Sequence, residues 1–285
     1  MKAIKQVLLL ALALLFCSEL SAQYRFGYFR VGVSAGAVNY FGDLDDDFGF
    51  YQFTKPGGGI QGTYRFNPMM QLRMSYLYGQ IGADDAMNND PHRQRRNLSF
   101  RSEVQEVSAQ LVIDFVPTER RYLFRPAVVP YIFGGIGIFT FNPEARFGGD
   151  EWIDLQPLGT EGQWLADPEN RYPEPYELTQ FNIPFGGGLR FRLSRRWDME
   201  VEIGWRKTFT DYLDDVSGYY PDRAQLAAAN PLSLIYSDRS DPVEWPNGVA
   251  GYNGIRGDNT QKDWYTYTGV TLSYVLDWVK CPTFR

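Results

Sequence analysis

Few side chains in this sequence are suited to nucleophilic, general-base or soft-metal chemistry. The chain has 285 residues with one histidine, His92, and two cysteines, Cys17 and Cys281. His92 lies in the polar segment NNDPHRQRRN at 88–97, and no GxSxG motif occurs in the sequence. A zinc site needs clustered His or Cys ligands, and a catalytic triad needs a nucleophile beside its base. We therefore predict a protein that is not an enzyme and uses no cofactor, with His92 exposed in a loop.

Carboxylates, in contrast, are plentiful and crowd together at two places. One cluster is Asp43, Asp45, Asp46 and Asp47, and the other is Asp211, Asp214 and Asp215. Calcium prefers such oxygen-rich sites, which makes Asp43, Asp45 and Asp47 weak metal candidates. The segment 43–54 departs from the EF-hand pattern, because Phe48 takes the glycine position and Thr54 the closing glutamate position. We favour solvated loop tips or turn-capping aspartates. The number of carboxylates is sufficient for a hydrolase that uses a carboxylate pair, but no residue pattern supports one.

The first 22 residues have the pattern of a secretory signal peptide. Lys2 and Lys5 precede an apolar stretch at 7–16, and Ala22 ends a small-residue cleavage site. This stretch is too short for a membrane-spanning helix, which needs about 20 residues. A lipoprotein anchored through Cys17 is disfavoured, because Phe16 is bulky where lipoprotein processing requires a small residue. We expect an exported mature domain at 23–285, with a retained N-terminal anchor as the alternative.

Beyond the leader, alternation of apolar and polar residues dominates the chain. In 69–82 the even residues, such as Leu72 and Met74, are apolar, and Gln71 and Arg73 lie on the odd face. The predicted strands are 29–37, 60–66, 69–82, 106–115, 128–141, 181–193, 197–206 and 264–276. The strand 128–141 is apolar on both parities, so its faces are not assigned. Alternation over about ten residues is typical of a strand that separates lipid from a polar lumen.

The connections between these eight strands alternate in length. Long segments at 43–55, 83–99, 142–179 and 210–262 follow the odd-numbered strands, and shorter ones at 67–68, 116–127 and 194–196 follow the even-numbered strands. This asymmetry predicts an all-β fold: a transmembrane antiparallel eight-stranded β-barrel with long extracellular loops, short periplasmic turns and both termini in the periplasm. A soluble lipocalin-like barrel is the alternative, since alternation alone does not distinguish the two.

The polar face of the strands favours the membrane barrel. It carries charges of both signs: Arg65, Arg73, Glu106, Asp114, Arg190, Arg192, Asp198, Glu200, Glu202 and Arg206. An eight-stranded barrel is just wide enough for side chains to fill, so these groups predict a lumen network without a pore. The apolar face carries Trp197, Trp205, Trp264, Tyr64 and Tyr76, as expected of an aromatic girdle. This apolar face makes membrane lipid the expected surrounding. The net charge of -6 opposes nucleic-acid binding.

Several segments together resemble one family of outer-membrane barrels. They are GVSAGAVNYFGDL at 32–44, FTDYLDDVSGYY at 209–220, WYTYTGVTLSY at 264–274 and CPTF at 281–284. In this combination the chain resembles the PorG family, DUF6089-type barrels of the type IX secretion system. The resemblance implies an outer-membrane component of that machine, in contact with the periplasmic ring of PorK and PorN type. A free-standing small outer-membrane barrel of structural or ligand-binding type is the alternative. Its recurring motif residues here are Tyr40, Gly42, Asp43, Leu44, Asp211, Tyr212, Asp214 and Asp215.

The tail at 277–285, DWVKCPTFR, is the expected partner contact. It follows the last predicted strand, so an even-stranded barrel leaves it in the periplasm. Trp278 and Phe284 provide apolar anchors, and Pro282 prevents regular strand continuation. The lone thiol of Cys281 either stays free or forms a disulfide with another chain in this oxidising compartment. We predict that this tail helps to hold the barrel on its ring partner.

Overall fold

The computed structural model describes residues 27–45, 53–88, 90–118, 122–146, 148–166, 169, 171–240 and 254–276. The predicted leader at 1–22 and the tail at 277–285 lie outside these residues, as do Asp46 and Asp47. Within the described segments, no helix has the length and apolar character needed to cross a membrane.

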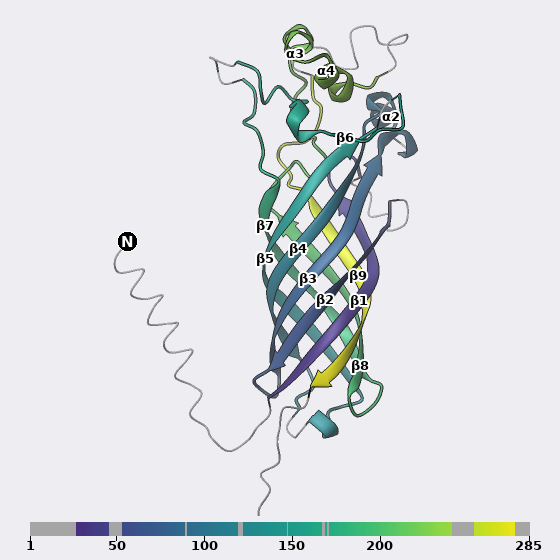
Figure 1. Cartoon of the computed structure of the whole chain (residues 1–285), viewed down its shortest axis with the longest axis vertical. Helices are drawn as coiled ribbons and strands as arrows, with labels where there is room; N and C mark the ends of the chain where they lie inside the picture. The colour runs from purple at the N-terminus through teal and green to yellow at the C-terminus, as the bar shows by residue number, and fades with distance from the viewer. Residues whose placement is uncertain are drawn as a thin grey trace, which may run out of the picture.

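Eight long antiparallel strands close into a barrel (Figure 1). They are β1 Tyr28–Phe41, β2 Lys55–Arg65, β3 Met70–Asp84, β4 Ser99–Asp114, β5 Val128–Ala145, β7 Thr179–Arg192, β8 Trp197–Thr208 and β9 Trp264–Leu276. Each strand pairs with its neighbour along the chain, and β1 pairs with β9 to complete the ring. The predicted fold class and all eight predicted strands are confirmed. The strands continue beyond half of the predicted ends, mostly at the side of the long loops.

Both ends of the barrel follow the predicted asymmetry of long loops and short turns. The turns at 66–69, 115–127 and 193–196 lie at one end, together with the start of β1 and the end of β9. The longer loops lie at the other end, which is uppermost in Figure 1. They contain the helices α2 Pro91–Arg96, α3 Arg223–Ala229 and α4 Pro231–Ser237, and the two-residue strand β6 Ile153–Asp154. In an outer-membrane barrel the loop end is extracellular and the turn end periplasmic.

The lower, turn-side half of the wall is apolar on its outside. On β3 the outward residues Leu72 and Met74 are exposed, whereas Gln71 and Arg73 are buried in the barrel. Neighbouring strands repeat this arrangement, and large aliphatic side chains such as Val33 and Ile136 are 66% and 71% exposed. Such a continuous exposed apolar surface is costly in water but favourable against lipid chains. The lower half therefore fits a membrane and rules out the soluble lipocalin-like alternative.

Polarity reverses in the upper half of the same strands. On β4, Val107 is the last exposed outward apolar residue, and above it Glu103 and Gln105 face outward. The inward residues there are Val104 and Phe100, which are buried. A strand section with polar groups outside and apolar groups inside is typical of a water-exposed barrel. The barrel therefore rises above the membrane as a conventionally packed domain.

The pairing of β5 resolves the strand whose faces the sequence left unassigned. Its even residues, including Ile132 and Ile138, face outward, and its odd residues, including Tyr131 and Phe139, are buried inside. Both faces of β5 are apolar because aromatic rings occupy its inner face. These rings pack against lumen arginines low on the strand and against other apolar side chains higher up. Low on the strand, the ring of Tyr131 lies against arginines of the lumen, and higher up Phe139 packs in an apolar cluster.

Candidate functional site: a filled lumen beneath an acidic cap

Glu200 on β8 is the centre of the charged network in the lower lumen. Its carboxylate accepts hydrogen bonds from Arg30 on β1 and Arg190 on β7, each at 2.7 Å, and from Gln61 on β2 at 2.9 Å. The Glu200 side chain is fully buried, and both arginines are almost so. A buried charge needs partners of opposite sign and complete hydrogen bonding. Alternation on four strands has placed these partners in one plane of the lumen.

Asp114 forms a second centre nearer the turns. Both of its carboxylate oxygens lie 2.9 Å from Nη1 of Arg190, which donates to them. It also accepts from the Gln71 amide at 2.8 Å and is paired with Arg65. Arg30 joins the two centres, since its Nη1 contacts Glu200 and its Nη2 contacts the Gln71 side chain. Further predicted lumen charges pair separately, Arg73 with Glu202 at 2.8 Å and Arg206 with Glu106 at 3.3 Å.

Two arginines differ from the sequence-based expectation. Arg192 was predicted to face the lumen but is exposed at the lower rim, where its guanidinium donates to the Arg125 carbonyl at 2.6 Å. The reason is position, because Arg192 is the last residue of β7 and the lumen ends there. Arg125, which lies in the turn at 115–127, instead enters the barrel from below. Its Nη2 and Nε groups bind Asp198 at 2.7 and 2.9 Å.

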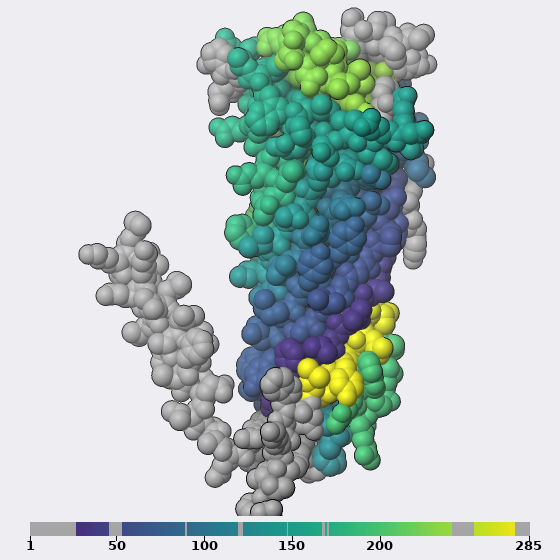
Figure 2. All heavy atoms as spheres, in the orientation of Figure 1, coloured from purple at the N-terminus to yellow at the C-terminus, as the bar shows by residue number. Residues whose placement is uncertain are grey.

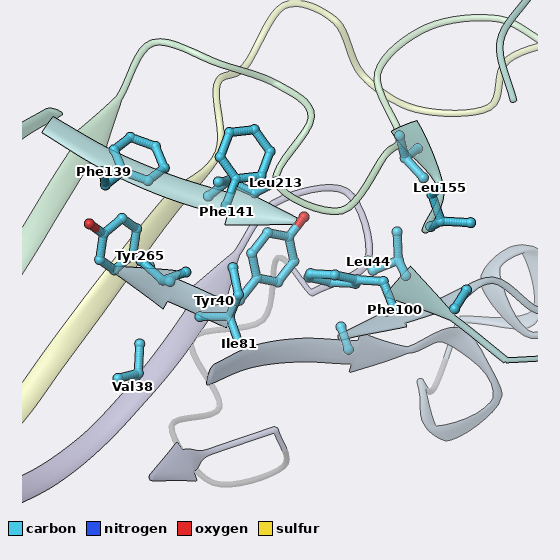
Figure 3. Close-up of a cluster of buried hydrophobic side chains, with 14 of the residues drawn as sticks. Val38, Tyr40, Leu44, Ile81, Phe100, Phe139, Phe141, Leu155, Leu213 and Tyr265 are labelled. Atoms are coloured by element: carbon cyan, nitrogen blue, oxygen red, sulfur yellow. The ribbon is translucent and has the colours of Figure 1, made fainter. Parts of the chain in front are cut away.

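An apolar plug fills the lumen above this network (Figure 3). Its labelled members are Val38, Tyr40, Leu44, Ile81, Phe100, Phe139, Phe141, Leu155, Leu213 and Tyr265. The rings of Tyr40 and Phe100 meet edge to face with centroids 4.9 Å apart. Tyr265 connects the plug to the network, because its hydroxyl donates to Glu106 at 2.7 Å. Each buried large apolar side chain contributes roughly 1.5–3 kcal/mol, so the plug is a stable closure of the barrel.

The loop motifs singled out in the sequence come together directly above the plug. The Tyr40 hydroxyl at the end of β1 donates to Asp214 at 2.6 Å and lies 3.3 Å from Asp263. Asp263 in turn accepts the backbone N–H of Leu213 at 2.9 Å. A Cβ atom on Gly42 would lie 2.1 Å from the Tyr40 hydroxyl and 2.0 Å from the Asp263 carboxylate. Glycine is therefore required at position 42 for this approach.

Asp215 and Glu161 bind the adjacent loops to each other. Asp215 is held with a φ of 67°, and its carboxylate accepts from Tyr176 at 2.7 Å and from Thr160. Glu161 accepts the backbone N–H of Ser217 at 2.9 Å and the Arg256 guanidinium at 3.0 Å. Although Glu161 lies in a loop, its side chain is only 1% exposed. It is therefore a buried anchor of the loops.

The remaining predicted motif residues also belong to this acidic cap, defined here as the carboxylates Asp43, Glu161, Asp211, Asp214, Asp215 and Asp263 with the loops that hold them. Leu44 is fully buried in the plug, and the ring of Tyr212 stacks on Tyr176 with centroids 4.6 Å apart. Asp211 accepts from the Ser217 hydroxyl at 2.7 Å. Packing thus unites all eight motif residues, although they come from two segments about 170 positions apart in the sequence.

Sequence patterns missed several cap residues that matter as much. Arg96 at the end of α2 binds Asp85 through two nitrogens at 2.7 and 2.9 Å and donates to the carbonyl oxygens of Asp43 and Arg256. Arg96 belongs to the segment predicted to be an exposed polar loop. His92, in the first turn of the same helix, is exposed as predicted. Asp263 was also missed, although its position immediately before β9, which pairs with β1, would have placed it near the end of β1.

Burial and mutual repulsion change the protonation of the cap carboxyls. Burial raises the pKa of Asp43 to about 6 and that of Asp215 to about 6. The pKa values of Asp214 and Asp263 are raised well above the usual range, first by burial and then by neighbouring negative charge, that of Asp43 and Asp214 respectively. The cap therefore holds more carboxyl groups than its nearby cations, chiefly Arg96 and Arg256, neutralise.

The predicted metal candidates Asp43 and Asp45 lie in the loops of the cap. Among the described residues, no three His, Cys, Asp or Glu side chains are arranged to hold a metal ion. Asp45 closes a tight turn with Gly42, through backbone hydrogen bonds of 3.0 and 3.1 Å. Asp43 accepts the backbone N–H of Asp258 at 2.9 Å. Both therefore act as turn and loop fasteners in the described structure, and the third metal candidate, Asp47, lies outside it.

We predict that the cap is more stable at pH 5 than at pH 8. A carboxyl whose pKa is raised binds its proton more tightly in the folded state, so stability falls as pH rises from the ordinary 3.8 through about 6. Replacing Asp214 with asparagine keeps an acceptor for the Val216 N–H, places an NH2 donor beside the Tyr40 hydroxyl, as a protonated carboxyl would, and removes one charge. It should stabilise the cap by about 1–3 kcal/mol at pH 8 and much less at pH 5. Hydrogen exchange of amides 210–218, corrected for the intrinsic rate, measures this, and equal protection at both pH values would contradict it.

The closed barrel, the exposed apolar belt and the filled lumen define a small outer-membrane β-barrel. The chain belongs to the family described as a domain of unknown function, DUF6089, whose model matches residues 5–153, just over half of the chain. No curated protein matches it significantly.

Solved structures with similar folds include several bacterial surface barrels. Neisserial surface protein A shares 9% identity at a TM-score of 0.42, over 86% of this chain and 96% of that chain. Ail of Yersinia pestis, in complex with a heparin analogue, shares 10% identity at a TM-score of 0.39, over 88% and 99%. The N-terminal barrel domain of Pseudomonas aeruginosa OprF shares 10% identity at a TM-score of 0.36, over 87% and 99%.

Proposed function

We propose that this protein is a non-enzymatic, non-conducting outer-membrane barrel that presents a rigid acidic cap outside the cell and protein-binding segments in the periplasm. The observation that carries this proposal is the double filling of the lumen. The network around Glu200 and Asp114 occupies its lower half, and the apolar plug occupies its upper half. A barrel filled in this way serves as a scaffold, because its interior offers solutes no open channel.

Conductance measurements test the scaffold function. We expect purified protein in a planar lipid bilayer to give no steady current above the bare membrane, because ions would have to cross both the salt-bridged layer and the plug. Insertion must be verified in the same preparation by a faster-running band on an unheated gel. A steady current that grows with protein content and salt concentration would contradict the proposal.

A second candidate is more specific, and the resemblance to the PorG family favours it. In this proposal the barrel is a component of the type IX secretion machinery and positions a periplasmic ring of PorK and PorN type. Three of the four motif segments that carry the resemblance, at 32–44, 209–220 and 264–274, form the cap core and the strand pair β1–β9. The fourth, at 281–284, lies outside the described residues. The end of β9 at Leu276 lies on the turn side, which is the side where a periplasmic ring would dock.

Capture from native membranes tests this second candidate. A tagged full-length chain should retain the ring proteins, and removal of 277–285 should reduce their recovery at least about tenfold if Trp278 and Phe284 are anchors. Cys281→Ser distinguishes a disulfide from non-covalent contact. The truncated chain must first be shown to reach the outer membrane. Undiminished recovery would move the contact to the turn at 115–127, and absence of ring proteins from the full-length sample would leave the free-standing barrel.

A further inference from the structure

The outside of the barrel carries an apolar groove on the wall formed by β9, β1, β2 and β3. The groove has a volume of about 620 Å³ and is lined mainly by outward side chains. This wall faces the viewer in Figure 2, where β1 is purple and the end of β9 is yellow. Gly62 on β2 lies between Val31 of β1 and Met74 of β3 in the strand register. The missing side chain at Gly62 makes this part of the wall concave.

The groove follows a double row of paired residues obliquely across the wall. The lower row runs from Trp197, the first residue of β8, and Tyr274, near the lower end of β9, to Met74 on β3. The row above it runs from Leu272 on β9 to Val107 midway along β4. The double row crosses from β8 to β4, and five spacings of about 4.8 Å give a length of about 24 Å. With strands tilted by about 35–45°, the row rises by about 15 Å along the membrane normal. That is half of a hydrocarbon core about 30 Å thick, which is the depth of one lipid leaflet.

A cationic group stands at the lower, periplasmic end of this groove. Arg196 in the turn between β7 and β8 is exposed, and its Nη1 donates to the Tyr274 hydroxyl at 2.9 Å. Tyr274 also packs edge to face on Trp197, with ring centroids 5.0 Å apart, and both rings line the groove. The hydrogen bond orients the Arg196 guanidinium, which binds phosphate oxygens well. An apolar channel one leaflet deep therefore ends at a phosphate-binding group.

We propose that this groove binds one phospholipid of the periplasmic leaflet, with an acyl chain along the row and its phosphate on Arg196. A flat wall would exchange lipids freely. Here the concave floor at Gly62 adds contact along the chain, and Arg196 adds a charge-assisted contact at the headgroup. The inference does not depend on any role in secretion.

Native mass spectrometry of delipidated protein titrated with dioleoylphosphatidylglycerol tests this site. The wild type should retain one lipid after mild activation. Gly62→Leu should reduce the retained fraction about tenfold by filling the groove, since its Cβ contacts only the tip of the Phe29 ring, at 3.0 Å. Arg196→Gln should reduce it by a similar factor through loss of the phosphate contact. All variants are first checked for folding by heat-modifiable migration, and Val33→Phe replaces Gly62→Leu if the latter does not fold.

Matched controls lie on the same lipid-facing surface away from the groove. Gly134 on β5 has open space where a Cβ would be built, so Gly134→Leu adds the same side chain without filling the groove. Lys207→Gln removes an exposed cation at the opposite rim, where Lys207 lies over the Trp264 ring. Equal lipid retention in wild type, test variants and controls would overturn the proposal. So would a protein dimer that Gly62→Leu dissociates while lipid retention stays unchanged, because the groove would then be an interface between copies.

Discussion

Replacing Glu200 with alanine should lower the free energy of unfolding by about 3–5 kcal/mol, because it leaves buried cations without their partner. Arg30 and Arg190 each donate to this carboxylate at 2.7 Å, and neither can reach water, since both are at most 4% exposed. Asp114 would still hold Arg190, but Arg30 would keep only the neutral Gln71 oxygen and a longer contact to Asp198 at 3.4 Å. Glu200→Gln should cost less, since it retains an acceptor in the same place.

Urea unfolding in lipid vesicles, followed by tryptophan fluorescence, measures this loss. The matched control is Glu177→Ala, because Glu177 is an exposed glutamate of the extracellular loops. Glu161 does not serve as a control, since it is buried against Arg256. If Glu200→Ala and Glu177→Ala unfold at the same urea concentration, the lumen carboxylate is solvated and the network contributes little.

The barrel itself was predictable because period-two alternation records which face of a strand meets lipid. On β8 and in the lower half of β3 each residue has one environment, so apolar and polar residues separate by parity. The pattern failed on β5, where Tyr131 and Phe133 face inward against the guanidinium of Arg73. An aromatic ring satisfies a buried cation through its π face, so an apolar residue can belong to a charged lumen. Alternation of apolar and polar residues therefore does not identify the inner face of such a strand.

The cap was predictable only as a set of motif residues near one rim. Its assembly depends on contacts between loops, such as Arg96 with the Asp43 carbonyl and Glu161 with the Ser217 amide. These contacts have no sequence period, because irregular backbone satisfies its polar groups one at a time. Arg125 was missed for the same reason. It reaches Asp198 from a turn, and residue spacing does not predict where a turn directs its side chain.

The second large effect is expected at Arg256, which connects three parts of the cap. Its guanidinium donates to Glu161 at 3.0 Å and to the Ser237 carbonyl at 3.2 Å, and it also binds the backbone oxygen of Asp215. Arg256→Ala should destabilise the cap by about 3–5 kcal/mol, because Glu161 would remain buried without its cation. The barrel wall should stay folded, since Arg256 makes none of the lumen contacts described above. Protease cleavage within 209–263 should therefore accelerate while heat-modifiable migration is unchanged.

A second substitution separates lost charge pairing from lost packing. In the Arg256→Ala background, Glu161→Gln removes the unpaired charge but keeps an acceptor for the Ser217 and Gly218 amides. The double variant should recover part of the lost protection, so that the two changes are less costly together than their separate effects predict. Strictly additive losses would show that Arg256 acts through packing and its carbonyl contacts alone. Unfolding of the barrel with the cap would contradict the separation of the two units, because the plug would then depend on Arg256 for its own closure.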